Sequence, residues 1–290
     1  MIKILQGDSR ELLSTLDANS VNCVITSPPY FGLRDYGIAE QIGLEETPEA
    51  YIDSLLAVFE EIWRVLKKDG TVWLNIGDSY ASDTKGSGGN STKSKKQLSN
   101  TGCRFKTRKF NHGVKSKDLL GIPWMIAFSL REQGWYLRQD IIWHKPNAMC
   151  ESVQDRCTKT HEYLFLLSKS ERYYFDQNAI KEQTKNNTLR QKRSIWTIPV
   201  QSFHGAHFAT FPKELVSYCV LAGCPETGTV LDPFFGSGTT GAVCRELNRN
   251  CIGIELNPEY AKVAEIRSSG FETRSEIMSS KIKYEDTDLW

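Results

Sequence analysis

Apolar residues recur along the chain with two periods, and this predicts alternating helices and strands. Residues 48–66 carry apolar side chains at three- and four-residue spacing, which predicts an amphipathic helix, and a further helix is expected at 123–132. Short apolar runs predict buried strands at 21–25, 71–76, 136–143, 163–167, 229–231 and 251–254. Such alternation predicts a mostly parallel sheet covered by helices on both faces, with ligand sites at the carboxyl ends of its strands.

The strand expected at 21–25 leads into Thr26-Ser27-Pro28-Pro29-Tyr30. Two consecutive prolines restrict the backbone, so the chain leaves the strand in one stiff conformation. The Ser27 hydroxyl and nearby carbonyls then form a fixed cluster of acceptors for an amino group, and Tyr30 offers a flat face to a ring. Acceptors that bind both N–H groups free the nitrogen lone pair and stabilise the positive charge that develops during alkylation. Taken alone, the motif fits a plain strand-ending turn followed by a core tyrosine equally well.

A second motif follows the strand expected at 229–231. It reads Asp232-Pro233-Phe234-Phe235-Gly236-Ser237-Gly238-Thr239-Thr240 and precedes a helix expected from about 241 to 247. Glycines let the backbone approach a ligand closely, and a helix start offers free N–H groups. A P-loop is excluded because no lysine follows the second glycine. The next strand ends in Glu255, which is placed to accept hydrogen bonds from ribose hydroxyls, with a solvated strand end as the alternative.

Together these segments resemble the beta group of DNA amino-methyltransferases, in which the catalytic motif precedes the cofactor motif, and the resemblance covers nearly the whole chain. It implies an α/β fold of the Rossmann-like methyltransferase type, circularly permuted in motif order, with S-adenosylmethionine as the cofactor. It implies that the target amino group is held by Ser27, Pro28, Pro29 and Tyr30. The cofactor-binding residues that it implies are Asp8, Phe208, Thr210, Phe211, Pro212, Asp232, Phe234, Gly236, Ser237, Gly238, Thr239 and Glu255.

A further segment, residues 143–147, resembles the strand end that borders the target-base pocket in this family. Its Pro146 departs from the family pattern and leaves the role of Lys145 open.

The formal net charge of +1 conceals an uneven distribution. Residues 84–117 contain ten basic residues and no acidic one, and a second basic stretch covers 185–193. A solvated linker is the alternative, but beside a base-methylation motif such stretches favour contact with DNA phosphates. We expect DNA contacts from inserts at about 82–117 and 183–195, with these candidates: Lys93, Lys95, Lys96, Arg104, Lys106, Arg108, Lys109, Arg190, Lys192 and Arg193.

Length and composition bound the remaining expectations. A chain of 290 residues is expected to form a single domain, 1–290, and no apolar run approaches the ~20 residues that a membrane span requires. Eight scattered cysteines without a C-x-x-C pair indicate reduced thiols and no metal site. We expect a protein of the cytoplasm of a bacterial, archaeal or phage-infected cell, acting on double-stranded DNA as a monomer or homodimer.

The resulting hypothesis is methylation of a base flipped out of duplex DNA, since an amino nitrogen inside the stack is out of reach of a methyl donor. The resemblance implies the N4 amino group of cytosine as the target, since family members with serine at the first motif position mostly modify it, and the N6 amino group of adenine is the alternative. An RNA or small-molecule methyltransferase on the same fold and a catalytically inactive DNA-binding homologue are also considered. An oxidoreductase with a nicotinamide cofactor is disfavoured, because it leaves Pro28-Pro29 unexplained.

Overall fold

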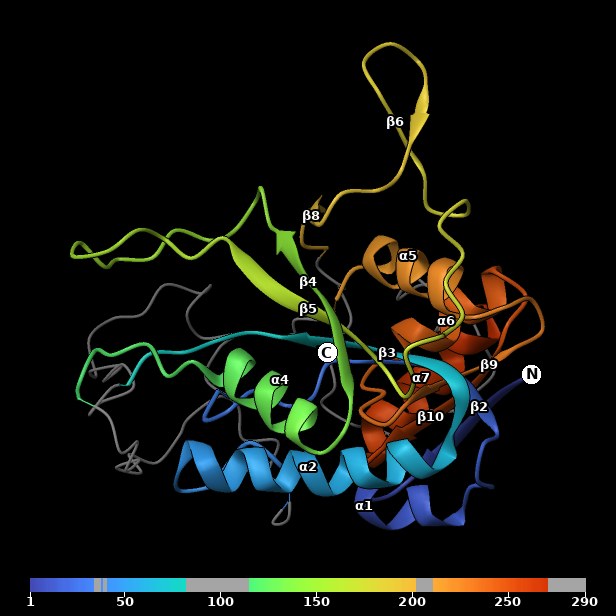
Figure 1. Cartoon of the computed structure of the whole chain (residues 1–290). Helices are drawn as coiled ribbons and strands as arrows, with labels where there is room; N and C mark the ends of the chain where they lie inside the picture. The colour runs from blue at the N-terminus through green and yellow to red at the C-terminus, as the bar shows by residue number, and fades with distance from the viewer. Residues whose placement is uncertain (34–37, 39–40, 82–114, 202–210, 271–290) are drawn as a thin grey trace.

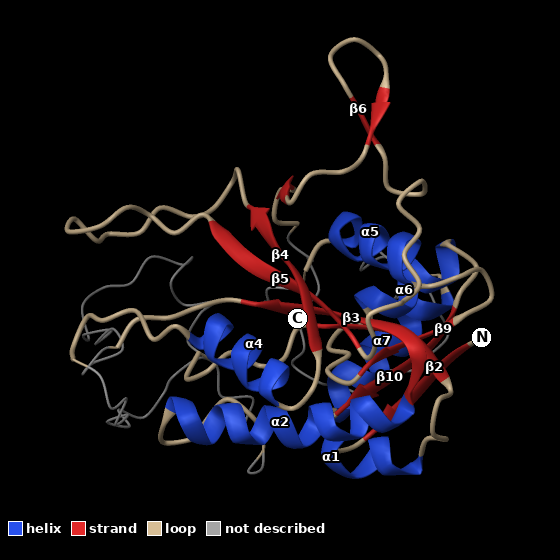
Figure 2. Cartoon of the chain, viewed as in Figure 1, coloured by secondary structure: helices blue, strands red, loops and turns tan. Residues whose placement is uncertain are grey.

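The computed structural model describes residues 1–33, 38, 41–81, 115–201 and 211–270. These residues form an α/β structure in which a twisted sheet lies between two layers of helices (Figures 1 and 2). The mostly parallel sheet and its two helical layers confirm the predicted fold class. None of the helices within the described ranges is long and apolar enough to cross a membrane.

The main sheet has eight strands. In spatial order they are β1 (Ile2–Gln6), β10 (Asn250–Glu255), β9 (Thr229–Asp232), β2 (Val21–Thr26), β3 (Leu66–Ile76), β5 (His161–Ser168), β4 (Tyr136–His144) and β8 (Ile195–Thr197). Strand β5 runs antiparallel to both β3 and β4, and the other neighbouring pairs are parallel. Two short strands, β6 (Glu182–Gln183) and β7 (Leu189–Arg190), form a separate hairpin that projects from the body of the molecule (Figure 1).

Helices cover both faces of the sheet. The first face carries α1 (Ser9–Leu12), the short 3-10 turn η1 (Leu13–Thr15), α2 (Pro48–Val65) and α4 (Ile122–Glu132). The other face carries α5 (Lys213–Gly223), α6 (Thr239–Glu246) and α7 (Pro258–Ser269). Each layer therefore has its own buried apolar cluster against the sheet.

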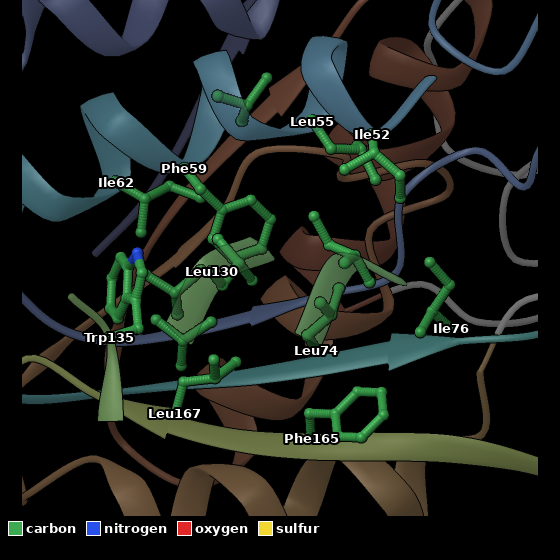
Figure 3. Close-up of a cluster of buried hydrophobic side chains, with 14 of the residues drawn as sticks. Ile52, Leu55, Phe59, Ile62, Leu74, Ile76, Leu130, Trp135, Phe165 and Leu167 are labelled. Carbon is green, nitrogen blue, oxygen red and sulfur yellow. The ribbon is translucent and has the colours of Figure 1, made fainter. Parts of the chain in front are cut away.

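The apolar period of residues 48–66 explains how α2 packs. Thr47 caps the helix by accepting a hydrogen bond from the Ala50 N–H (3.1 Å), and Pro48 occupies the first turn, where its missing N–H leaves no donor unpaired. The apolar stripe of α2 packs with residues of β3 and β5 in the cluster that Figure 3 shows, where Phe59 and Leu74 are fully buried. Burial of each large side chain of this kind stabilises the fold by about 1.5–3 kcal/mol.

The start of β3 differs from the prediction. Residues 67–70 precede the strand expected at 71–76, but they lie within β3, which begins at Leu66. The reason is tertiary pairing, since Leu66 is buried and lies opposite Val21 of β2, and an irregularity after Val21 accommodates the extra residues.

Strands β2 and β9 are neighbours at the centre of the sheet, although about 200 residues separate them in the sequence. Cys23 lies opposite Val230 and Val24 opposite Leu231, in parallel register. The carboxyl ends of both strands therefore meet at the same edge of the sheet, and this topology brings the two sequence motifs together.

Candidate active site

One cavity lies at the carboxyl edge of the central strands. Its volume, counted as the space that the centre of a water molecule can reach, is about 220 Å³. Its walls include Ser27, Pro28, Pro29 and Tyr30 from the segment after β2, and Gly236 and Ser237 from the loop after β9. The structure therefore places the predicted amino-binding motif and the predicted cofactor loop in a single space.

The segment after β2 is held by contacts from its neighbours. The Tyr51 hydroxyl of α2 donates to the Pro29 carbonyl (2.8 Å), whereas none of the described residues donates a hydrogen bond to the Pro28 carbonyl. The Tyr30 ring lies against Gly77, where an added Cβ would come within 2.7 Å of the ring. The Pro28 carbonyl is thus available to a ligand, and the backbone at Gly77 makes room for the Tyr30 ring.

Four polar side chains form a network in the cavity wall beside Ser27. The Tyr30 hydroxyl donates to Glu162 Oε2 (2.7 Å), and Asn75 Nδ2 donates to the same oxygen (3.1 Å). The Lys145 ammonium donates to Glu162 Oε1 and lies 4.4 Å from the centre of the Trp143 ring. Burial raises the pKa of the Tyr30 hydroxyl well above its usual value, and the neighbouring Glu162 carboxylate raises it further. The phenol therefore stays protonated at neutral pH.

The sequence did not single out Asn75 and Glu162 as site residues. Both line the cavity, and so does Lys145, whose role the sequence left open. Glu162 lies at the amino end of β5, and because β5 runs against its neighbours, this end shares an edge with the carboxyl ends of β3 and β4. One sequence signal was available, namely a polar residue placed directly before or within an apolar strand.

Asp232 ends β9 and lies beneath the cavity, with only 1% of its surface exposed. Its carboxylate accepts hydrogen bonds from the Thr26 hydroxyl (3.1 Å), the Thr240 hydroxyl (2.6 Å) and the Phe234 N–H (3.1 Å). Burial raises its pKa to about 6, while these donors oppose that shift. Asp232 thus ties the end of β2 to the loop and helix that follow β9.

Backbone geometry shapes the loop after β9. Gly236 and Gly238 both have positive φ, +52° and +81°, which L side chains rarely adopt. A Cβ on Gly238 would lie 2.8 Å from Ala264, whereas one on Gly236 would meet nothing within 4 Å, and Gly236 lines the cavity. From α7, Arg267 donates to the Ser237 carbonyl (3.1 Å) and to the Ser237 and Thr239 hydroxyls (2.6 and 3.2 Å). Arg267 was not predicted from the sequence as a site residue, and its hydrogen bonds hold the loop against α7.

Glu255, at the end of β10, faces the cavity opposite the amino-binding segment. Its carboxylate accepts hydrogen bonds from the backbone N–H groups of Gly236 (2.7 Å) and Asn257 (2.8 Å). Burial raises its pKa to about 7, against the effect of these two donors. Each carboxylate oxygen has a second lone pair, so Glu255 can also accept hydrogen bonds from ligand hydroxyls.

The other predicted cofactor residues fall into three groups. Asp8, Phe211, Phe234 and Thr239 line the cavity, and Asp8 also caps α1 and forms an ion pair with Arg10 (2.5 Å). Pro212 is buried and precedes α5, and Gly238 precedes α6; neither is among the lining residues. Phe208 and Thr210 lie outside the described residues.

The predicted DNA-contacting residues are placed only in part. Seven of them lie outside the described residues: Lys93, Lys95, Lys96, Arg104, Lys106, Arg108 and Lys109. Arg190 and Arg193 both pair with Glu182, at 2.8 and 3.2 Å. The Lys192 ammonium lies 3.6 Å from the centre of the Tyr218 ring, and burial lowers its pKa. These three side chains therefore have partners within the protein, and these contacts stabilise the base of the β6–β7 hairpin.

Within the described ranges, no group of three or more His, Cys, Asp or Glu side chains comes together in a metal-binding arrangement. What the site offers is a glycine loop and an acidic strand end for a nucleotide-like ligand, beside oxygen acceptors for an amino group. This combination defines the class of Rossmann-like enzymes that transfer a group to an amino nitrogen.

Comparison with known proteins narrows the class. Residues 21–266 match the model of the N6/N4 methyltransferase family, described as DNA methylase. The chain is 51% identical to the type II methyltransferase M.SmaI of Serratia marcescens (91% of this chain, 90% of that protein). It is 49% identical to the type II methyltransferase M.Cfr9I of Citrobacter freundii (93% of this chain, 88% of that protein). The chain therefore belongs to the N6/N4 family of DNA methylases and is a DNA amino-methyltransferase.

Solved structures share the same fold. The PvuII cytosine-N4-specific DNA methyltransferase aligns with a TM-score of 0.68 at 21% identity, covering 92% of this chain and 86% of that one. TTHA0409 from Thermus thermophilus, complexed with S-adenosyl-L-methionine, aligns with a TM-score of 0.62 at 25% identity, covering 94% of this chain and 97% of that one. Both likenesses extend over nearly the whole chain, which supports the predicted methyltransferase fold.

Proposed function

We propose that this DNA methylase transfers a methyl group from S-adenosylmethionine to the N4 amino group of a cytosine flipped out of duplex DNA. The observation that carries the proposal is the single cavity shared by Ser27 and Gly236. A methyl donor bound at the loop after β9 then lies within the same space as an amino group bound after β2. Proximity of this kind supplies a large part of the rate acceleration in group transfer.

The cofactor half of the cavity fits S-adenosylmethionine. Glu255 offers carboxylate oxygens to ribose hydroxyls, and the open space beside Gly236 lets a ligand approach the backbone closely. Phe211 and Phe234 supply apolar walls for an adenine ring. When bound, the cofactor supplies an electrophilic methyl group. TTHA0409, the relative at 25% identity, was crystallised with this molecule.

The other half of the cavity fits an amino group on a flat ring. The Ser27 hydroxyl and the Pro28 carbonyl serve as acceptors for its two N–H groups, and the stiff Pro28-Pro29 backbone keeps them in place. These acceptors stabilise the positive charge that develops on nitrogen, and the Tyr30 ring stacks on the base. Flipping the base out of the duplex requires a few kcal/mol.

Cytosine is the preferred target for two reasons. Serine at the first motif position is found mostly in family members that modify cytosine. In addition, Lys145 brings an ammonium group to the cavity wall, where it can donate a hydrogen bond to a ring carbonyl. Cytosine carries such a carbonyl, and adenine does not. Methylation at N6 of adenine is the second candidate, because Ser27 can bind either amino group.

The β6–β7 hairpin is proposed as a DNA-contacting element. It stands clear of the body (Figure 1), and a two-stranded ribbon fits the major groove of B-DNA. Lys185, Asn186 and Asn187 at its turn are exposed, and the turn is closed by a hydrogen bond from the Thr184 N–H to the Thr188 carbonyl (2.8 Å). We assign phosphate contact to Lys185, and base-edge contact to the two asparagines. The residues around 82–117 remain proposed DNA contacts.

A methyl-transfer assay tests the proposed function. Labelled S-adenosylmethionine is incubated with the protein and unmethylated duplex DNA, duplex RNA or free nucleosides, and the label transferred to each substrate is counted after the cofactor has been removed. Retention on duplex DNA alone is expected, since the hairpin and basic segments suit a duplex. Labelling of RNA or nucleosides in preference to DNA would contradict the proposed substrate. We also propose that the protein acts in the cytoplasm, as a monomer or homodimer.

A further inference from the structure

A chain of hydrogen bonds runs from the amino-binding motif into the wall of the cavity. The Ser27 hydroxyl donates to the Tyr30 hydroxyl (3.4 Å), and the Tyr30 hydroxyl donates to Glu162 (2.7 Å). All three residues line the cavity that holds the proposed target amino group. They belong to the segment after β2 and to β5, which lie on opposite sides of β3 in the sheet.

The partners of Glu162 fix the direction of donation along this series of hydrogen bonds. Lys145 donates to one carboxylate oxygen, and Asn75 and Tyr30 donate to the other. An ammonium group has only protons to donate, and the Asn75 amide nitrogen also only donates, so Glu162 acts here as an acceptor. The Tyr30 hydroxyl also lies 3.4 Å from Asn75 Oδ1, but the shorter contact (2.7 Å) directs its single proton to Glu162, and a phenol lone pair faces Ser27.

The orientation of Tyr30 decides what Ser27 presents to a ligand. A hydroxyl has one proton and two lone pairs. Since the Ser27 proton points toward Tyr30, its lone pairs are left to face the cavity. If the hydrogen bonds ran in the opposite direction, the Ser27 proton would point into the cavity, toward the N–H groups of the base. The Ser27 O–H and the base N–H would then face each other as two donors and repel.

We propose that Glu162 is a positioning residue that, through Tyr30, holds the Ser27 hydroxyl as an acceptor for the target amino group and takes up the proton which that group later loses. This inference rests on the proposed function. It assigns to Glu162 a role in the reaction that Glu162 exerts through Tyr30 and Ser27, not by its own contact with the cofactor or the DNA.

The proton balance is complete along this path. The nitrogen lone pair forms the new N–CH₃ bond, and the electrons of the broken S–CH₃ bond stay on sulfur, which becomes neutral. The nitrogen is then positively charged and still carries two protons. One of them passes to the Ser27 oxygen as the Ser27 proton passes to Tyr30 and the Tyr30 proton to Glu162. The products are a neutral methylamino group and a protonated Glu162, which solvent deprotonates after release.

Two substitutions separate this role from a purely structural one. Tyr30→Phe keeps the stacking ring and removes the link between Ser27 and Glu162. Glu162→Gln keeps the size of the side chain, but its amide can accept on one side only. If its oxygen faces Lys145, its NH₂ group donates toward Tyr30 and reverses the chain. We expect each variant to lower kcat by roughly 10²- to 10⁴-fold, the range that positioned proton transfer contributes, and we expect Tyr30→Phe to leave the KM for DNA unchanged.

The decisive comparison is the double variant, Tyr30→Phe with Glu162→Gln. If Glu162 acts through Tyr30, the glutamine substitution adds little further loss in the phenylalanine background, because the link is already gone. Equal losses in both backgrounds, or a fully active Tyr30→Phe variant, would overturn the proposal. Should Glu162→Gln fold poorly, as thermal unfolding would reveal, the Tyr30→Phe variant alone still decides the matter.

A second readout does not depend on turnover. Sites methylated by the wild-type protein in bacterial genomic DNA are mapped, and a duplex is made with fluorescent pyrrolocytosine at the target position. We expect Tyr30→Phe, in which the Ser27 hydroxyl is free to turn its lone pairs toward the base, to bind and flip this base as the wild-type protein does, without cofactor. Loss of flipping in this variant would assign the Tyr30 hydroxyl to base binding and contradict the relay. If the wild-type protein produces no methylated cytosine, the proposed function fails. If the wild-type protein methylates cytosine and the variants methylate it at the same rate, only the relay fails.

Discussion

At the residue scale, the two buried carboxyl groups of the cofactor half have different tasks. Asp232 has its carboxylate bonded to Thr26, Thr240 and the backbone of Phe234 beneath the cavity. Glu255 faces the cavity and can accept bonds from a ligand. The sequence grouped both as cofactor-binding residues, and the distinction depends on side-chain directions that only the folded chain defines.

Two alanine substitutions test the assignment of the two halves. We expect Asp232→Ala to abolish cofactor binding, because the loop and the end of β2 lose their common anchor. Tyr30→Ala is expected to leave cofactor binding near normal and to remove most turnover, because the base-stacking ring and the hydroxyl that links Ser27 to Glu162 are both lost. Calorimetric titration with S-adenosylmethionine and turnover assays on both variants measure these effects. The reverse pattern would show that the two halves are wrongly assigned.

The raised pKa of Glu255 predicts that cofactor affinity depends on pH. Without ligand its pKa is about 7, so the carboxylate loses its charge as pH falls through neutrality. Ribose hydroxyls donate best to the ionised form, and the cofactor therefore binds more tightly above this pKa. Between about pH 6 and pH 8 we expect affinity to rise roughly tenfold. Calorimetry of Glu255→Gln is the control, and the same rise in that variant would refute the role given to Glu255.

At the element scale, how well the sequence predicted the site depended on strand direction. The motif after β2 and the loop after β9 follow parallel strands, so the rule that ligands bind at carboxyl ends predicted their common position at one edge of the sheet. Glu162 precedes an apolar run, but nothing in the sequence indicated that β5 is antiparallel, and the same rule put its amino end away from the site. The sequence also could not show that tertiary pairing extends β3 back to Leu66.

The β6–β7 hairpin carries a prediction of its own. Lys185 is exposed at its turn, whereas the ammonium of Lys192 lies over the Tyr218 ring. We expect Lys185→Ala to weaken DNA binding and to reduce the slope of log affinity against log salt by about one, as the loss of one phosphate contact does. Lys192→Ala is the matched control, with little change in that slope. Equal slopes for Lys185→Ala and the wild-type protein, measured by fluorescence anisotropy, would exclude the hairpin turn from phosphate contact.

At the scale of the whole molecule, the permuted order of the motifs has no effect on the site. Strands β2 and β9 pair side by side although the chain visits them about 200 residues apart, and Asp232 joins their ends by a side-chain hydrogen bond to Thr26. The fold thus builds a donor half and an acceptor half around one space. We propose that catalysis by this protein depends on that juxtaposition.

Mass spectrometry of nucleosides tests the central claim most directly. Unmethylated DNA is incubated with S-adenosylmethionine and either the wild-type protein or Ser27→Ala, digested and analysed. We predict N4-methylcytosine from the wild-type protein and a loss of most of this product with Ser27→Ala, while cofactor binding persists. A product that is only N6-methyladenine would contradict the choice of base. Undiminished methylation by Ser27→Ala would contradict the role of the Ser27 hydroxyl as an acceptor for the target amino group.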